Sequence, residues 1–229
     1  MQLYVFIGSS LHFVRRNPRH QYFLGDKMLP QSDLEKDLGI HISSDLKFST
    51  HASHIAKKAE RALCVLNRTI VSRDCDVYLK LFKSIVRPLL EYATPVWNPY
   101  QVRDKFIIER VQRRATRNMI GLRDLPYESR LQATGLCTLE RRRLIADLTE
   151  VFKMKNSKDD FHKFFKLSQS SRVVTRGHNL KLHKLPFRSS IREHFFTQRI
   201  IDTWNSLPSE TVNASSVDNF KYRISTFDF

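Results

Sequence analysis

Four arginines in the middle of the chain, Arg110, Arg113, Arg114 and Arg117, are the residues best suited to bind a polyanion. Their spacing of i, i+3, i+4 and i+7 places them on one face of a helix. Each guanidinium group can grip a phosphate through two hydrogen bonds, so the row can follow successive phosphates along about 10 Å of helix. The alternative is a solvated face in which the arginines pair with Glu109 and nearby acids.

Two further groups of bases offer the same chemistry. Lys57 and Lys58 fall on the outer face of another expected helix. Arg141, Arg142 and Arg143 are consecutive, and such a triplet serves as a phosphate contact, as a weak nuclear-import signal, or simply as an exposed, solvated stretch. We include all five residues among the candidate nucleic-acid contacts.

Residues 155–190 combine bases with phenylalanines in a stretch without clear periodicity. Such a mixture suits single-stranded nucleic acid, because nucleobases stack on aromatic rings while cations follow the backbone. The alternative is that the phenylalanines belong to the hydrophobic core.

No complete catalytic or metal site is found in the sequence. Glycine-rich phosphate loops and the GxSxG nucleophile elbow are missing. The adjacent Asp159 and Asp160 lie in a lysine-rich polar stretch, where solvated loop acids are expected rather than a two-metal centre. His51 and His54 lie one helical turn apart without a fixed third ligand, which favours a structural or capping role. We therefore expect no cofactor, no metal and no enzymatic activity of its own.

The composition agrees with a folded, basic protein. The 229 residues carry a formal net charge of +16, and 41% of them are hydrophobic. The positive excess is spread over the whole chain, which indicates a polyanionic partner such as nucleic acid. No run of about 18 apolar residues occurs, so we expect no membrane span. Three cysteines without a CxxC motif and an N-terminus without a basic leader favour the nucleus or the cytoplasm.

The elements that must position these residues are mainly helical. Short strands are expected at 3–7, 22–24 and 36–42. After these, apolar residues recur every three to four positions, which predicts helices. One expected helix, capped by Ser49 or Thr50, carries Lys57 and Lys58. The other expected helices cover about 74–89, 102–120, 126–134, 138–152, 191–206 and 216–224. In the helix expected at 74–89 the inward residues should be Val77, Leu81, Ile85 and Leu89.

Five ordered blocks resemble the region that follows the catalytic palm in non-LTR retrotransposon reverse transcriptases of the jockey-like, endonuclease-bearing clades. The blocks are KDLGIHI (36–42) with DLKF (45–48) and His51, LFKSIVRPLLEYA (81–93) with VWNP (96–99), IERVQRRATR (108–117), LCTLERRR (136–143), and FF (195–196) with WNSLP (204–208) and FK (220–221). Together they extend over nearly the whole chain.

The resemblance implies three parts. Residues 1–44 would be a small β-hairpin remnant of the palm end, 45–125 a helical thumb-like bundle that packs against template–primer duplex, and 126–229 a helical post-thumb region containing the basic loop 155–190. The aspartate motif that the family needs for polymerisation does not occur in this sequence. The resemblance therefore implies a non-catalytic protein that binds RNA or RNA–DNA duplex, with a fuller-length reverse transcriptase as a possible partner.

Two other interpretations stay open at this stage. The chain can be a protein-interaction module that uses the regions around Trp97, Tyr100 and Trp204. It can also be a gene-model fragment of a reverse transcriptase without a stable function, in which case residues 1–44 should expose apolar surface.

Overall fold

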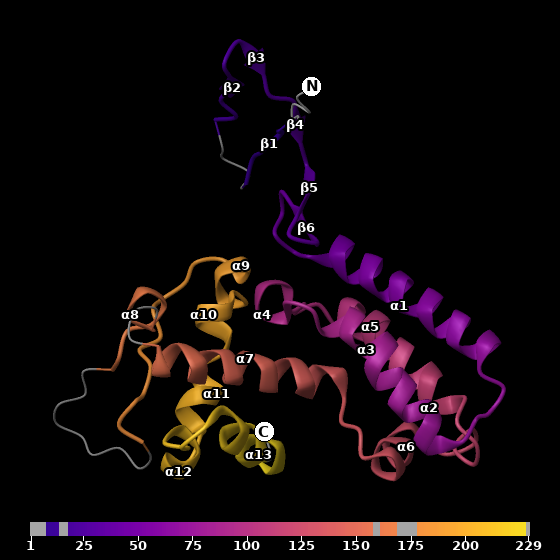
Figure 1. The fold of residues 1–229 in the computed structure, drawn as a ribbon. Helices are drawn as coiled ribbons and strands as arrows, with labels where there is room; N and C mark the ends of the chain where they lie inside the picture. The colour runs from indigo at the N-terminus through magenta and orange to yellow at the C-terminus, as the bar shows by residue number, and fades with distance from the viewer. Residues whose placement is uncertain (1–7, 14–17, 158–160, 169–177, 228–229) are drawn as a thin grey trace, which may run out of the picture.

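The computed structural model describes residues 8–13, 18–157, 161–168 and 178–227. In this part the chain is mainly helical, as expected, and one long helix joins two groups of helices (Figure 1). The first group contains α1 (Ser49–Thr69), α2 (Cys75–Leu81), the π-helix η1 (Phe82–Val86), α3 (Arg87–Glu91), α4 (Thr94–Trp97), α5 (Val102–Arg117) and α6 (Tyr127–Thr134). The long helix α7 (Leu139–Asn156) leads to α8 (Phe161–Phe164), α9 (Ser190–Glu193), α10 (Phe196–Arg199), α11 (Ile201–Ser206), α12 (Ser209–Val212) and α13 (Val217–Thr226).

The N-terminal segment forms a narrow β arm that projects from the helices (Figure 1). Its strands pair two by two: β1 with β4 in parallel, β2 with β3 and β5 with β6 antiparallel. Their bounds are β1 (Ser10–Leu11), β2 (Phe23–Leu24), β3 (Lys27–Met28), β4 (Gln31–Ser32), β5 (Leu34–Asp37) and β6 (Ile40–Ser43). Residues 3–7, expected as a strand, lie outside the described residues.

The single strand expected at 36–42 is in fact a tight hairpin. Asp37 pairs with Ile40, so only Leu38 and Gly39 form the loop. Both have positive φ, 45° and 88°, which is the conformation of a two-residue type I′ turn. The Leu-Gly pair is therefore a chain reversal, and the alternating pattern belongs to two strands.

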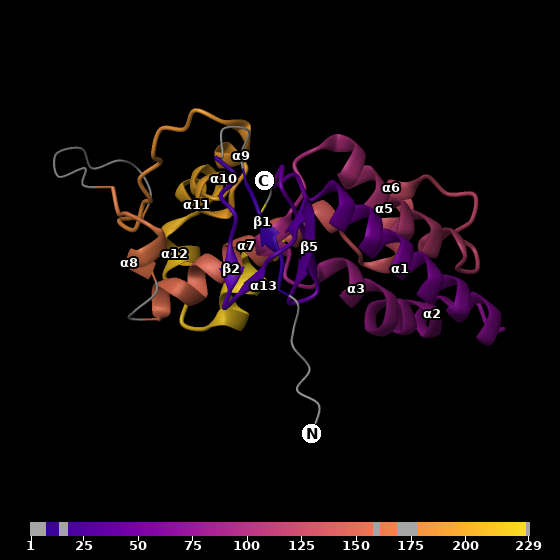
Figure 2. The same ribbon diagram turned by 90° about the horizontal axis from the view of Figure 1, so that it is seen from above.

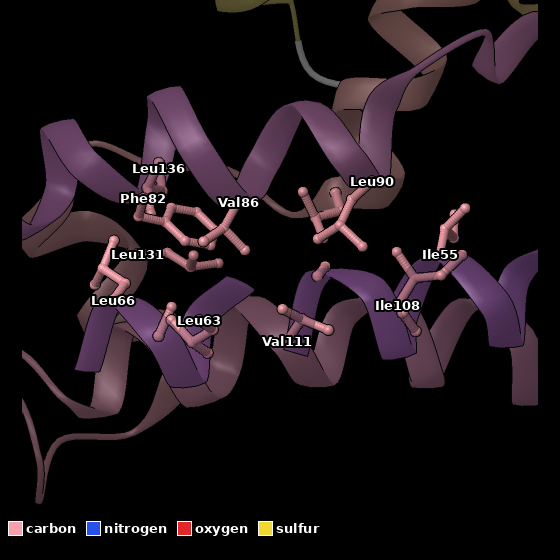
Figure 3. Packing of buried hydrophobic residues seen from close by; sticks show 14 of the residues in the cluster. Ile55, Leu63, Leu66, Phe82, Val86, Leu90, Ile108, Val111, Leu131 and Leu136 are labelled. Atoms are coloured by element: carbon pink, nitrogen blue, oxygen red, sulfur yellow. The ribbon is translucent and has the colours of Figure 1, made fainter. Parts of the chain in front are cut away.

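The first hydrophobic core lies between α1, η1, α3, α5 and α6. Figure 3 shows the aliphatic and aromatic side chains of these helices interdigitating. They include Ile55, Leu63, Leu66, Phe82, Val86, Leu90, Ile108, Val111, Leu131 and Leu136. Ile40 is the arm's contribution to this core, which fixes the base of the arm against α1.

Helices α2, η1 and α3 bury a different face from the one expected. Their buried side chains each lie one position after the expected set, and they are Tyr78, Phe82, Val86 and Leu90. Val77 and Ile85 are exposed instead. The π-turn accommodates Pro88, which has no N–H to donate to the Ser84 carbonyl. The Arg87 N–H donates to the Phe82 carbonyl, five residues earlier, as in a π-helix.

The second core contains side chains of α7, α8 and the helices from α10 onward. Phe152 of α7 stacks on Phe220 of α13 with ring centroids 4.3 Å apart, next to the buried Trp204. Tyr127 and Leu139 still belong to the first core. The first core therefore extends past the boundary expected at 125/126, and α7 contributes to both cores.

Seen from above, the two helical groups lie on opposite sides of the arm (Figure 2). The expected continuous helix at 191–206 is three short helices, since His194-Phe195 and Ile200 interrupt it. Among the described residues, no helix combines the length and apolar character needed to cross a lipid bilayer.

Candidate nucleic-acid interface

The four arginines of the expected stripe are all exposed on α5. Arg110, Arg113, Arg114 and Arg117 face solvent, while Ile108 and the rest of the opposite face are buried in the first core. The helix starts at Val102 and ends at Arg117, close to the expected bounds. The structure thus brings the four guanidinium groups to one surface, as their spacing predicted.

Helix α1 lies beside α5 and runs parallel to it. At their N-terminal ends the Ser49 hydroxyl donates a hydrogen bond of 2.6 Å to Asp104. At their C-terminal ends the Asn118 amide donates to the Asn67 side chain at 3.3 Å. The two helices therefore lie side by side, and both carry exposed bases.

A single ion pair joins the two rows of bases. Arg110 Nη2 lies 3.2 Å from Glu60 Oε1 across the α1–α5 seam. Lys57, Arg61 and Arg68 follow one another at intervals of four and seven along α1, on the solvent side of Glu60. We call Lys57, Arg61, Arg68, Arg110, Arg113, Arg114 and Arg117 the basic face; the exposed Lys58 lies beside it.

The acids of both helices point to internal partners. Asp104 is buried against Ser49, and Glu109 accepts hydrogen bonds from the Leu139 N–H at 2.9 Å and from the Tyr127 hydroxyl. Apart from Glu60, no acidic side chain of α1 or α5 is free to neutralise the exposed bases. The expected alternative therefore holds in part: Glu109 does not pair with the arginines, but the face is solvated and Arg110 pairs with a nearby acid, Glu60.

Arg113 is held in place by an aromatic ring. Its guanidinium lies 4.1 Å from the centroid of the Tyr127 ring, and its carbonyl accepts a hydrogen bond of 2.9 Å from Arg130. Burial lowers the pKa of Arg130, and the neighbouring Arg117 lowers it further. Arg113, Arg117 and Arg130 therefore lie near one another at this end of α5.

The triple arginine differs from the exposed stretch that its sequence indicated. Arg141 donates to the carbonyls of Ser225 and Phe227. Arg142 forms a bidentate pair with Glu91. Arg143 is 1% exposed, with its Nε donating to Asn98 at 3.0 Å.

These contacts join α7 to its neighbours instead of presenting bases to solvent. Three consecutive helical residues sweep about 200° around the axis, so they cannot all face outward on a helix that packs on several sides. We therefore leave Arg141, Arg142 and Arg143 out of the interface.

The described part of the basic aromatic stretch is divided between core and surface. Phe161 and Phe165 are buried in the second core, while Phe164 and Phe187 are exposed. Lys155 donates to the Val212 carbonyl at 2.7 Å. Asp159 and Asp160 lie outside the described residues.

The two tryptophans expected to bind protein are internal. Trp97 is 1% exposed and donates to the Tyr92 carbonyl, and Trp204 is fully buried and donates to the Leu180 carbonyl. Tyr100 stacks on His194 with centroids 4.1 Å apart. The two tryptophans therefore stabilise the fold from inside, whereas Tyr100 is partly exposed.

His51 and His54 meet a third histidine, His41, near the base of the arm. His51 is buried, its Nδ1 accepts the His41 N–H at 3.2 Å, and its ring lies against Trp97. Burial lowers the pKa of His51 to about 4, and nearby His41 and His54 add to the shift. In the described part of the chain no three metal-ligating side chains are grouped as a metal site.

Sequence reasoning missed two bases near the end of the α5 stripe. Arg73 and Arg123 lie in loops and line a surface hollow together with Arg117. Helical spacing identifies bases along one helix, but it does not relate loop residues 50 positions apart in the chain. The sequence signal was limited to one arginine in each loop, and each is followed by an aspartate, Asp74 or Asp124.

Comparisons with known proteins give one weak relationship. An uncharacterized protein of Caenorhabditis elegans is 24% identical over 145 residues, which cover 60% of this chain and 71% of that protein. No family model matches the chain, and no solved structure matches it.

Proposed function

We propose that this chain is a non-catalytic nucleic-acid-binding protein that places its basic face along the phosphate backbone of RNA–DNA or RNA duplex. One observation carries this proposal: the exposed residues of α1 and α5 are rich in bases, while their acids are bound internally or, at Glu60, paired. Such a charge distribution binds phosphates by releasing counterions, without reading sequence.

The resemblance to non-LTR reverse transcriptases supports the same function. In that interpretation residues 45–125 act as the thumb, and α5 is the helix that contacts the duplex. The catalytic aspartates would then come from a fuller-length reverse transcriptase, with which this chain would act in the nucleus or the cytoplasm. The proposal does not require any chemistry by this chain itself.

Salt dependence of binding is the direct test. A labelled RNA–DNA duplex is titrated with the full chain at several salt concentrations, and fluorescence anisotropy gives the affinity at each. Replacing Arg110, Arg113, Arg114 and Arg117 by glutamine should weaken binding and reduce the slope of log affinity against log salt by about 3 to 4, since each phosphate contact adds about 0.9.

A matched variant separates this local effect from the change in net charge. Lys27, Lys153, Arg188 and Lys221 are exposed and lie outside the basic face. Replacing these four bases by glutamine removes the same charge and should change the slope by about 1 at most. If both variants change the slope equally, the basic face is not the binding site.

Protein interaction through the arm is a second candidate function. Tyr22, Phe23, Leu24 and Met28 are all more than half exposed on β2 and β3 or next to them, and Leu38 is 82% exposed. Exposed apolar side chains in a cluster mark an interaction surface, and a fragment lacking its palm would show them too. An interaction module would have no affinity for the duplex at about 150 mM salt, where the basic face should still bind.

A further inference from the structure

Three arginines converge on a hollow of about 570 Å³ that opens where α1 and α5 end. Arg117 belongs to the last turn of α5, Arg73 to the loop between α1 and α2, and Arg123 to the segment after α5. The other lining residues are Asn67, Asn118, Met119, Ile120 and Gly121. None of these lining residues is acidic, so the charged side chains that line the hollow are all basic.

Arg73 is fixed before any ligand arrives. Its Nη1 and Nη2 donate to the side-chain and backbone oxygens of Asn67 at 2.7 and 2.8 Å, and its guanidinium lies 5.6 Å from the centre of the Tyr78 ring. An arginine has five N–H donors, so three remain for another acceptor. Binding to this side chain would therefore cost little further ordering.

The loops that carry the arginines are tied to each other. The Ile120 N–H donates to the Arg73 carbonyl at 3.0 Å. The Tyr78 hydroxyl donates to Asn67 Oδ1 at 2.6 Å, and the Asn118 amide donates to the same oxygen at 3.3 Å. These bonds join the ends of both helices and preform the shape of the hollow.

Arg117 and Arg123 are exposed, and no ion pair within the described residues involves either of them. Their guanidinium groups stay available to an anion in solution. Arg117 and Arg113 also lie close enough to Arg130 to disfavour its charged form, and an anion in the hollow would offset this repulsion.

We propose that this hollow binds a phosphate group, and a terminal phosphate monoester more tightly than an internal phosphodiester. The inference rests on the proposed nucleic-acid binding and adds to it a site for a phosphorylated strand end. Near neutral pH a monoester carries almost two negative charges and three acceptor oxygens, whereas a diester carries one charge. Three converging guanidinium groups complement the higher charge.

The test compares two RNA–DNA duplexes that differ only in a 5′-phosphate or a 5′-hydroxyl group. With the full chain at about 150 mM salt, the phosphorylated duplex should bind about tenfold more tightly, as expected for added charge-assisted hydrogen bonds. Arg123→Gln should abolish this preference. Arg103→Gln, at the other end of α5 and outside the hollow, should leave it unchanged.

A titration of the isotope-labelled chain with inorganic phosphate tests the hollow without nucleic acid. The amide NMR signals of Gly121 and Arg123 should shift in the unmodified protein and not in Arg123→Gln. Duplex binding with equal affinity for both ends would overturn this inference and leave the proposed function standing. Phosphate-induced shifts without duplex binding would support the hollow and overturn the proposed function, whereas the absence of both effects would overturn both.

Discussion

The carboxylate of Asp147 on α7 accepts two hydrogen bonds from the guanidinium of Arg199 on α10, at 2.9 Å from Nε and 3.0 Å from Nη2. The same guanidinium donates to the Pro95 carbonyl of α4 at 2.8 Å, and Asp147 also accepts from the Asn98 amide. Because α4 belongs to the first helical group and α10 to the second, this buried pair links the two groups.

Breaking this pair should strongly destabilise the protein. Asp147→Asn leaves the largely buried Arg199 guanidinium without its counter-charge, so we expect the free energy of unfolding to fall by about 3–5 kcal/mol in urea denaturation. Asp147→Leu combined with Arg199→Met should cost less than the two single changes added together. Lys184→Met, which removes an exposed pair with Asp202, is the control and should cost about 1 kcal/mol or less.

The buried His51 should make stability depend on pH. Its pKa is about 4 in the folded chain against an ordinary value of 6.5, so the folded state resists protonation. The contribution of neutral His51 to the free energy of unfolding is fully present above pH 6.5, decreases as the pH falls, and is lost below about pH 4. The total loss is about 3 kcal/mol. Urea denaturation at pH 7 and pH 4.5 measures the difference.

His51→Phe should remove most of this pH dependence, whereas His54→Gln, at an exposed position, should retain most of it. The variant His51→Phe can shift stability at all pH values, but the comparison concerns only the change between the two pH values. An unchanged pH dependence in His51→Phe would show that other groups cause it.

The observed register of α2, η1 and α3 predicts opposite outcomes at neighbouring positions. Phe82→Ala should lower the free energy of unfolding by about 3–5 kcal/mol, because Phe82 is fully buried and leaves a cavity. Ile85→Ala, at a side chain that is half exposed, should cost less than about 1 kcal/mol. The reverse order in denaturant titrations would support the face expected from the sequence.

The arm should promote self-association of the isolated chain. Phe23→Ser with Leu24→Ser replaces two exposed apolar side chains that take no part in either core. We expect less association in sedimentation experiments and an unchanged thermal midpoint. Exposed Val71→Ser with Val102→Ser is the matched control in the helical part, and an equal effect there would show that the arm has no special role.

Local signals in the sequence predicted several helix ends, where one or two hydrogen bonds determine whether a helix begins or stops. Thr138 caps α7 by accepting the Arg141 N–H, Asp74 caps α2, and Gly135 ends α6 with a positive φ of 61°. Each of these depends on a residue and its nearest neighbours. The cap expected at Ser49 or Thr50 was wrong, because α1 is preceded by Phe48 and has no side-chain cap.

Features that depend on packing partners were harder to predict. The arginine stripe of α5 was placed correctly, because that helix has one buried and one exposed face. The burial of Arg143 depends on two helical groups closing around α7, and the shifted face of η1 depends on how the chain accommodates Pro88. Arg73 and Arg123 meet only because tertiary contacts bring two loops together.

The sharing of α7 by both cores constrains how this protein can change in evolution. Leu139 near its start packs in the first core, and Leu148 and Phe152 pack in the second. One inserted residue between them would rotate one core against the other by about 100° and move it by about 1.5 Å. Insertions should therefore be tolerated in the exposed loop at 185–188 but rejected between 140 and 147, where the length of the helix fixes the orientation of one core relative to the other.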